Sequence, residues 1–190
     1  MFNLKIKYMN KSMKLTSKDI IAQRDNICKT KTKYWRIIKA ENVMAKKAKA
    51  AGMGSGFDLK ALHNQILQMS DKLIKIKLML NAINNGITTF NFEEAKKTHY
   101  YTIYLACEKK EQLAQWDEIL TKHTINPATK AKAGIKGTGK IEIFTSAKIA
   151  SIKKNLQLEI NKLDADIAKF NDETVLEITS DEDIKQLMAV

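Results

Sequence analysis

Apolar residues recur at alternating spacings of three and four in two long stretches of the chain, residues 59–83 and 146–170. An α-helix has about 3.6 residues per turn, so this spacing places the apolar side chains on one narrow stripe, suited to packing against another stripe. We expect the stripe of the second stretch to form a self-association seam. Its residues are Ile149, Ile152, Leu156, Ile160, Leu163 and Ile167.

A basic helix is predicted from about residue 16 to Met44. Thr16 or Ser17 is the expected N-cap, and Asp19 favours the positive end of the helix dipole. The apolar residues of this segment repeat at about seven-residue steps, and Lys and Arg lie between them. The pattern indicates an amphipathic helix with a basic polar side.

Clear signals mark the start and the end of the helix over residues 59–83. Residues 45–56 are rich in Ala, Lys and Gly, which predicts a flexible loop. Asp58 then offers an N-cap, and Asn84-Asn85-Gly86 offers a left-handed C-cap. The helix is therefore expected to be an independent, well-bounded element.

Another helix is predicted over residues 92–123, with Asn91 and Glu94 in a capping arrangement. Three short segments rich in β-branched and aromatic residues are strand candidates. They cover residues 87–92, for which an extended connector is the alternative, and residues 141–144 and 175–178. The last two could pair with each other in parallel, and an antiparallel pairing with another subunit is equally allowed. Ser146 is the expected cap of the final helix.

The predicted fold class is mainly α, with three long antiparallel coiled-coil-like helices and two or three short β-strand segments. Residues 13–178 are expected to form one helical domain with flexible loops at 45–56 and 124–140. Residues 1–12 read as a basic N-terminal extension, and residues 179–190 as an acidic tail. The length of 190 residues and the 44% hydrophobic content suit one globular domain with a core.

The two cysteines, Cys28 and Cys107, lie far apart in helical patterns, which favours reduced thiols and a cytoplasmic location. No apolar run approaches the roughly 20 residues that a membrane span needs. Residues 1–10 also lack the apolar core of a signal peptide. The sequence therefore predicts no stable membrane span.

The formal charge of +12 is unevenly distributed. Residues 1–56 hold 14 Lys and Arg against 3 Asp and Glu, whereas residues 171–190 hold 1 against 6. A basic head can bind nucleic acid or another anionic surface, can meet the acidic tail of another copy, or can simply solvate a helix face. The candidate anion contacts are Lys29, Lys31, Lys33, Arg36, Lys46, Lys47 and Lys49.

No catalytic, cofactor-binding or metal site is predicted. The string Gly134 to Lys140 fits the spacing G-x-x-x-x-G-K of a phosphate-binding loop. Ile141 stands where Ser or Thr should follow, and a strand rather than a helix is expected next, so we interpret the string as a basic loop. The three histidines have no Cys or carboxylate at metal-ligand spacing. A nucleophilic role for Cys107 is less expected than burial on its helix.

The chain resembles the septicolysin-like family of small bacterial and phage proteins. The resemblance covers residues 13–178 and rests on Met13-Lys14-Leu15, on Arg24-Asp25, on the strand candidate at 141–144 and on Leu163-Asp164-x-x-Ile167-x-x-Phe170-Asn171. Asp172 stands where the family has Trp, and the basic head is unlike the family norm. The resemblance implies a helical, self-associating fold and no catalytic residues.

These patterns lead to a functional expectation with two alternatives. We expect a non-enzymatic helical scaffold or interaction protein that forms a homo-oligomer through its seams and has no small-molecule substrate. The first alternative is a nucleic-acid or anionic-surface binder that acts through the basic helix and loop. The second is a membrane-perturbing protein that acts through amphipathic helices.

Overall fold

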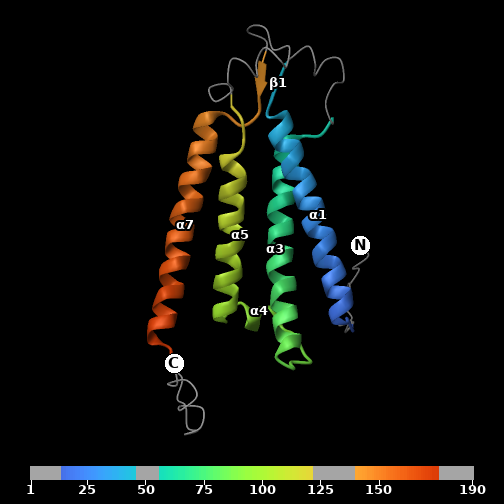
Figure 1. Ribbon diagram of the computed structural model, residues 1–190, viewed down its shortest axis with the longest axis vertical. Helices are drawn as coiled ribbons and strands as arrows, with labels where there is room; N and C mark the ends of the chain where they lie inside the picture. The colour runs from blue at the N-terminus through green and yellow to red at the C-terminus, as the bar shows by residue number, and fades with distance from the viewer. Residues whose placement is uncertain (1–13, 46–55, 122–139, 176–190) are drawn as a thin grey trace, which may run out of the picture.

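The computed structural model describes residues 14–45, 56–121 and 140–175 (Figure 1). The elements, in chain order, are α1 (Ser17–Glu41), β1 (Val43–Ala45), α3 (Leu59–Asn84), α4 (Phe92–Ala95), α5 (His99–Asp117), β2 (Lys140–Glu142) and α7 (Ser146–Glu173). The mainly-α prediction is confirmed. Four of the helices in these ranges are long, so the expectation of three is wrong, because α1 and α5 are both full-length members of the array.

The helix starts follow from local side-chain caps. Thr16 and Asp19 form a capping box on α1, with the Asp19 backbone N–H donating to the Thr16 hydroxyl at 3.2 Å. The Asp58 carboxylate accepts from the Lys60 N–H at 2.8 Å, as predicted for α3. On α7 the N-cap is Thr145 rather than Ser146, since the Thr145 hydroxyl accepts from the backbone of Lys148.

The predicted helix over residues 92–123 is two helices. Asn91 caps the four-residue α4, and its side-chain oxygen accepts from the Glu93 N–H at 2.9 Å. The chain then turns, because both the hydroxyl and the N–H of Thr98 donate to the Ala95 carbonyl. In a continuous helix that carbonyl would accept from His99. Helix α5 therefore starts afresh and ends at Asp117, short of the expected end.

The four long helices run alternately up and down and lie side by side in the order α7, α5, α3, α1 (Figure 1). The closest packing is between α1 and α3 and between α5 and α7, and α3 also packs against α5. The array therefore consists of two antiparallel hairpins, α1 with α3 and α5 with α7, joined along α3 and α5. The helices spread apart toward the end where α4 lies.

Strands β1 and β2 pair antiparallel across the other end of the array, with Met44 opposite Ile141. The strand candidate at 141–144 overlaps β2, but its partner is β1 and not 175–178. Val175 is not in a strand and is 87% exposed, while residues 176–178 lie outside the described ranges. The segment 87–92 is not a strand: residues 87–91 form an irregular connector, the alternative expected for this segment, and Phe92 is the first residue of α4.

The core lies at the sheet end of the array. Trp35, Trp116 and Phe144 are its large rings, and each is almost completely buried. Aliphatic residues from α1, α3, α7 and the segment after α5 fill the space around the rings, and α5 contributes Trp116, so all four helices meet there. The aliphatic members of the cluster are Ile38, Leu59, Leu62, Ile66, Ile119, Ile149 and Leu156.

Several predicted segments lie outside the described residues. They are the extension at 1–12, most of the loops at 45–56 and 124–140, and the tail at 179–190. Both thiols are exposed, contrary to the expected burial of Cys107. Among the described helices, none is long and apolar enough to cross a membrane.

Candidate functional site

The structure separates the predicted basic residues into two groups. Lys29, Lys33 and Arg36 are exposed on α1. Lys31 is only 2% exposed and points into the array. The remaining three predicted contacts, Lys46, Lys47 and Lys49, lie outside the described residues.

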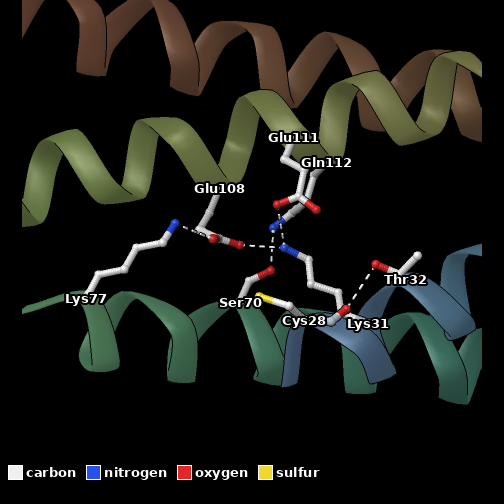
Figure 2. Close-up of polar contacts among 8 residues, drawn as sticks. All are labelled: Cys28, Lys31, Thr32, Ser70, Lys77, Glu108, Glu111 and Gln112. Carbon is white, nitrogen blue, oxygen red and sulfur yellow. Dashed lines mark hydrogen bonds and ion pairs between the residues drawn. The ribbon is translucent and has the colours of Figure 1, made fainter. Parts of the chain in front are cut away.

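The assignment of Lys31 to an anion-binding surface is wrong. Its ammonium group lies 2.6 Å from Glu108 Oε2 and 2.9 Å from Glu111 Oε2, both on α5 (Figure 2). Lys31 precedes the buried Trp35 by four residues, so both side chains lie on the inner face of α1. The ammonium group of Lys31 is therefore paired with two carboxylates of its own chain and does not face an external anion.

Glu108 is the centre of this buried network. Its Oε1 accepts from Lys77 of α3 at 2.9 Å, while its Oε2 accepts from Lys31 (Figure 2). Beside this network, Gln112 of α5 donates to the Ser70 hydroxyl of α3 at 3.4 Å. The network therefore ties α1, α3 and α5 together.

Burial alone would raise the pKa of the Glu108 carboxyl. Hydrogen bonds and charges from Lys31 and Lys77 outweigh burial, so the pKa of Glu108 lies below its ordinary value. The carboxylate is ionised at neutral pH, and each of its oxygens accepts from an ammonium group. The arrangement fixes charges in place and sets the alignment of three helices.

The outer face of α1 is different. Lys29, Lys33 and Arg36 follow one another at spacings of four and three, which places them on one stripe. No other described residue forms an ion pair with any of the three. The neighbouring Lys39, by contrast, turns toward α5 and pairs with Glu118 at 2.6 Å. We call Lys29, Lys33 and Arg36 the basic stripe.

His63 of α3 lies in the aromatic core rather than at a metal site. Its ring centroid is 5.0 Å from that of Trp116 and 5.9 Å from that of Phe144. Burial lowers the pKa of His63, and the positive charge of Lys148 lowers it further. The imidazole is therefore neutral at pH 7. No group of three or more potential metal ligands gathers within the described ranges.

The two core indoles have buried N–H groups without a hydrogen-bond acceptor. The rings of Trp35 and Trp116 meet edge to face at 5.5 Å, and Trp116 meets Phe144 in the same way. Aromatic rings carry negative charge on their faces, so edge-to-face packing is favourable. This cluster has the character of a structural core.

The predicted seam of α7 faces α5 of the same chain. Ile149, Leu156 and Ile160 are buried, and the other three seam residues, Ile152, Leu163 and Ile167, are half-buried. Ion pairs border this contact, including Lys109 with Glu159 at 2.6 Å. Much of the stripe is therefore covered within one chain.

The acidic partners of Lys31 were not predicted from the sequence, although a signal for them exists. Lys31 and Lys77 fall where the apolar stripes of α1 and α3 require an inward-facing residue, four residues from Trp35 and Leu73 respectively. Glu108 likewise lies eight residues before Trp116 on α5. Charged residues of opposite sign at such positions on different helices predict a buried ion pair.

No protein-family model, curated protein or solved structure matches this chain. The resemblance to the septicolysin-like family therefore stays a prediction. Evidence on function therefore comes from the charges, contacts and burial of the described residues.

Proposed function

We propose that this chain is a non-enzymatic helical interaction protein that binds nucleic acid through the outer face of α1. The observation that supports the proposal is the basic stripe: three exposed cations on one helix face, without an ion pair to any other described residue. Closely spaced cations without acidic partners bind phosphate backbones by releasing condensed counterions.

The distribution of carboxylates supports this choice of surface. Glu108, Glu111 and Asp117, the acidic residues of α5, all form ion pairs with lysines of α1, α3 or α7. The acidic groups of this helix are therefore paired within the chain, Glu108 in the interior and Glu111 and Asp117 at the surface. The positive charge of the α1 outer face is left uncompensated by them.

Nucleic acid fits this face better than a membrane does. A helix that lies on a membrane needs an exposed apolar side to enter the lipid. The apolar side of α1 is turned inward, with Ile20, Trp35 and Ile38 buried. The exposed surface of α1 carries mainly positive charge, which favours contact with phosphate groups.

The test is titration of the protein into a fluorescent DNA duplex at several salt concentrations. We expect binding by the parent to weaken steeply with salt. The triple variant Lys29→Gln, Lys33→Gln, Arg36→Gln should bind more weakly at low salt. Its slope of log K against log salt should be smaller by up to about 3, because up to three phosphate contacts are lost.

The matched control is Lys72→Gln, Lys154→Gln, Lys162→Gln, which removes three exposed lysines elsewhere on α3 and α7. It should retain a salt slope close to that of the parent. Parent protein that ignores the duplex, or equal losses in both variants, would overturn the proposal. Binding to anionic vesicles without duplex binding would instead support the membrane alternative.

Self-association is a second candidate function, supported by exposed apolar residues from the middle to the C-terminal end of α7. Phe170 and Leu158 are exposed large apolar residues, and Leu163 and Ile167 are only half-buried. A second copy could cover this remaining surface through an isologous contact. Light scattering on a sizing column gives the mass directly: a multiple of 21.6 kDa supports the scaffold role, and a monomer at high concentration contradicts it.

A further inference from the structure

A cavity of about 470 Å³ lies at the spread end of the array, between α3, α4 and the start of α5. Leu78 and Ala82 of α3 and Ala95 of α4 line it, and Phe90 and Ile87 of the turn before α4 contribute to its wall. The volume falls within the range of about 300–1,000 Å³ that is typical of small-molecule sites. Most of the surface that faces the cavity is apolar, although uncharged polar residues such as Asn81, Asn91 and Thr98 also line it.

The walls of the cavity are held by backbone hydrogen bonds. Helix α3 ends in a Schellman motif, in which the Ile87 N–H donates to the Ala82 carbonyl at 2.9 Å and the Gly86 N–H to the Ile83 carbonyl at 3.0 Å. Gly86 takes the left-handed conformation that this motif requires, with φ of +72°. On the other side, Asn91 caps α4. The cavity is therefore formed before any ligand enters.

The charge of the lining limits the chemistry of the ligand. Glu94 is the one ionisable carboxylate among the lining residues, and it pairs with Lys97 at 2.9 Å. No lysine, arginine or histidine lines the cavity. A charged ligand would lose hydration without gaining an opposite charge, whereas an uncharged apolar ligand would lose little.

We propose that this cavity binds a small uncharged apolar molecule, with its hydrocarbon body against Leu78, Ala82 and Ala95. The exposed residue Tyr100 also lines the cavity. The site is separate from the basic stripe, so it does not depend on the nucleic-acid proposal.

The experiment uses the full chain and the uncharged fluorescent probe N-phenyl-1-naphthylamine. We expect saturable enhancement of its fluorescence at one site per chain. Decanol should displace the probe, and decanoate and decylammonium should do so at least about tenfold less well, because the cavity holds no unpaired charge. Filling the cavity with Ala95→Leu or Ala82→Leu should weaken probe binding by at least about tenfold.

Ala150→Leu on the exposed side of α7 is the control for the added side chain and should bind the probe like the parent. Far-UV circular dichroism and the thermal midpoint check that both cavity variants are folded, and one folded variant suffices. The proposal is overturned if the parent shows no saturable signal, if a folded cavity variant binds as well as the parent, or if decanoate competes as well as decanol.

Discussion

The buried ammonium group of Lys31 lies between two glutamate side chains that compensate its charge. Lys31 and Glu108 are each 2% exposed, so neither charge can recover hydration if the other is removed. Glu111 is the more exposed of the two carboxylates, so solvent screens its attraction to the Lys31 ammonium group more strongly. The network thus makes the alignment of the hairpins depend on individual side chains.

Replacing Glu108 with Gln should lower the free energy of unfolding by about 3 kcal/mol at pH 7, because the Lys31 charge stays buried with one fewer carboxylate. Urea unfolding measures the loss. The double variant Lys31→Met, Glu108→Leu should recover most of it, since apolar residues of similar size fit a dry site.

The control for Glu108→Gln is Lys110→Gln, which breaks an exposed ion pair with Asp164. It should cost less than about 1 kcal/mol. If Glu108→Gln were as mild as this control, the buried network would contribute little to the fold.

The pKa of His63 predicts a pH dependence of stability. The pKa of His63 in the folded chain lies below the ordinary value of 6.5. Just below pH 6.5, the imidazole is therefore protonated in the unfolded chain but still neutral in the folded chain. The stability from the neutral imidazole is therefore present above about pH 6.5 and is lost as the pH falls below it. The depressed pKa of Glu108 acts in the same direction, but below its ordinary value of 4.5.

Thermal midpoints at about pH 7.5 and about pH 5.5 test this assignment. The parent should lose stability at the lower pH, and His63→Phe should lose less, because Phe keeps the ring contacts without the proton. His99→Phe is the control, since the His99 ring stacks on Phe170 away from the core cluster. A full loss in His63→Phe would assign the effect to another group.

Among the elements, the side chain of Asn42 links three segments at the sheet end of the array, next to the β1–β2 pair. Asn42 follows α1 and is completely buried. Its amide nitrogen donates to the carbonyls of Leu120 and Phe144, and its oxygen accepts from the Phe144 N–H at 2.7 Å. The end of α1 is thereby fixed to the residues that follow α5 and precede α7.

Asn42→Ala should lower the free energy of unfolding by about 3 kcal/mol, because it leaves buried backbone groups without partners. Urea unfolding gives the total, and hydrogen exchange of the Phe144 amide shows whether the sheet end opens first. The control Asn85→Ala removes an exposed side chain that bonds only within α3, and should cost less than about 1 kcal/mol.

At the scale of the whole molecule, the two hairpins distribute charge between inside and outside. The inner charges of α1 and α3 meet those of α5, and the basic stripe lies on the outer side of α1, at one edge of the array (Figure 1). The α7 stripe lies at the opposite edge, against α5. The proposed nucleic-acid surface and the proposed self-association surface are therefore far apart and can be tested separately.

Local signals in the sequence were sufficient to predict the local structure. The caps at Thr16, Asp58 and Asn91 and the stop at Gly86 were predictable, because such signals depend on residues only a few positions apart. The mainly-α class followed from hydrophobic periodicity in the same way. The break after Ala95 was missed, because no proline or glycine marks it.

Only the tertiary structure decided which charges face inward and which remain for a partner. The spacing of Lys31 from Trp35 places Lys31 on the inner face of α1, but only the packing of α1 on α3 and α5 shows that this lysine is buried and meets Glu108, while Lys29 and Lys33 stay exposed. The pairing of β1 with β2 also joins segments far apart in the chain. Periodicity gives each helix an inner face, but the burial of a particular charge depends on which helix supplies the opposite one.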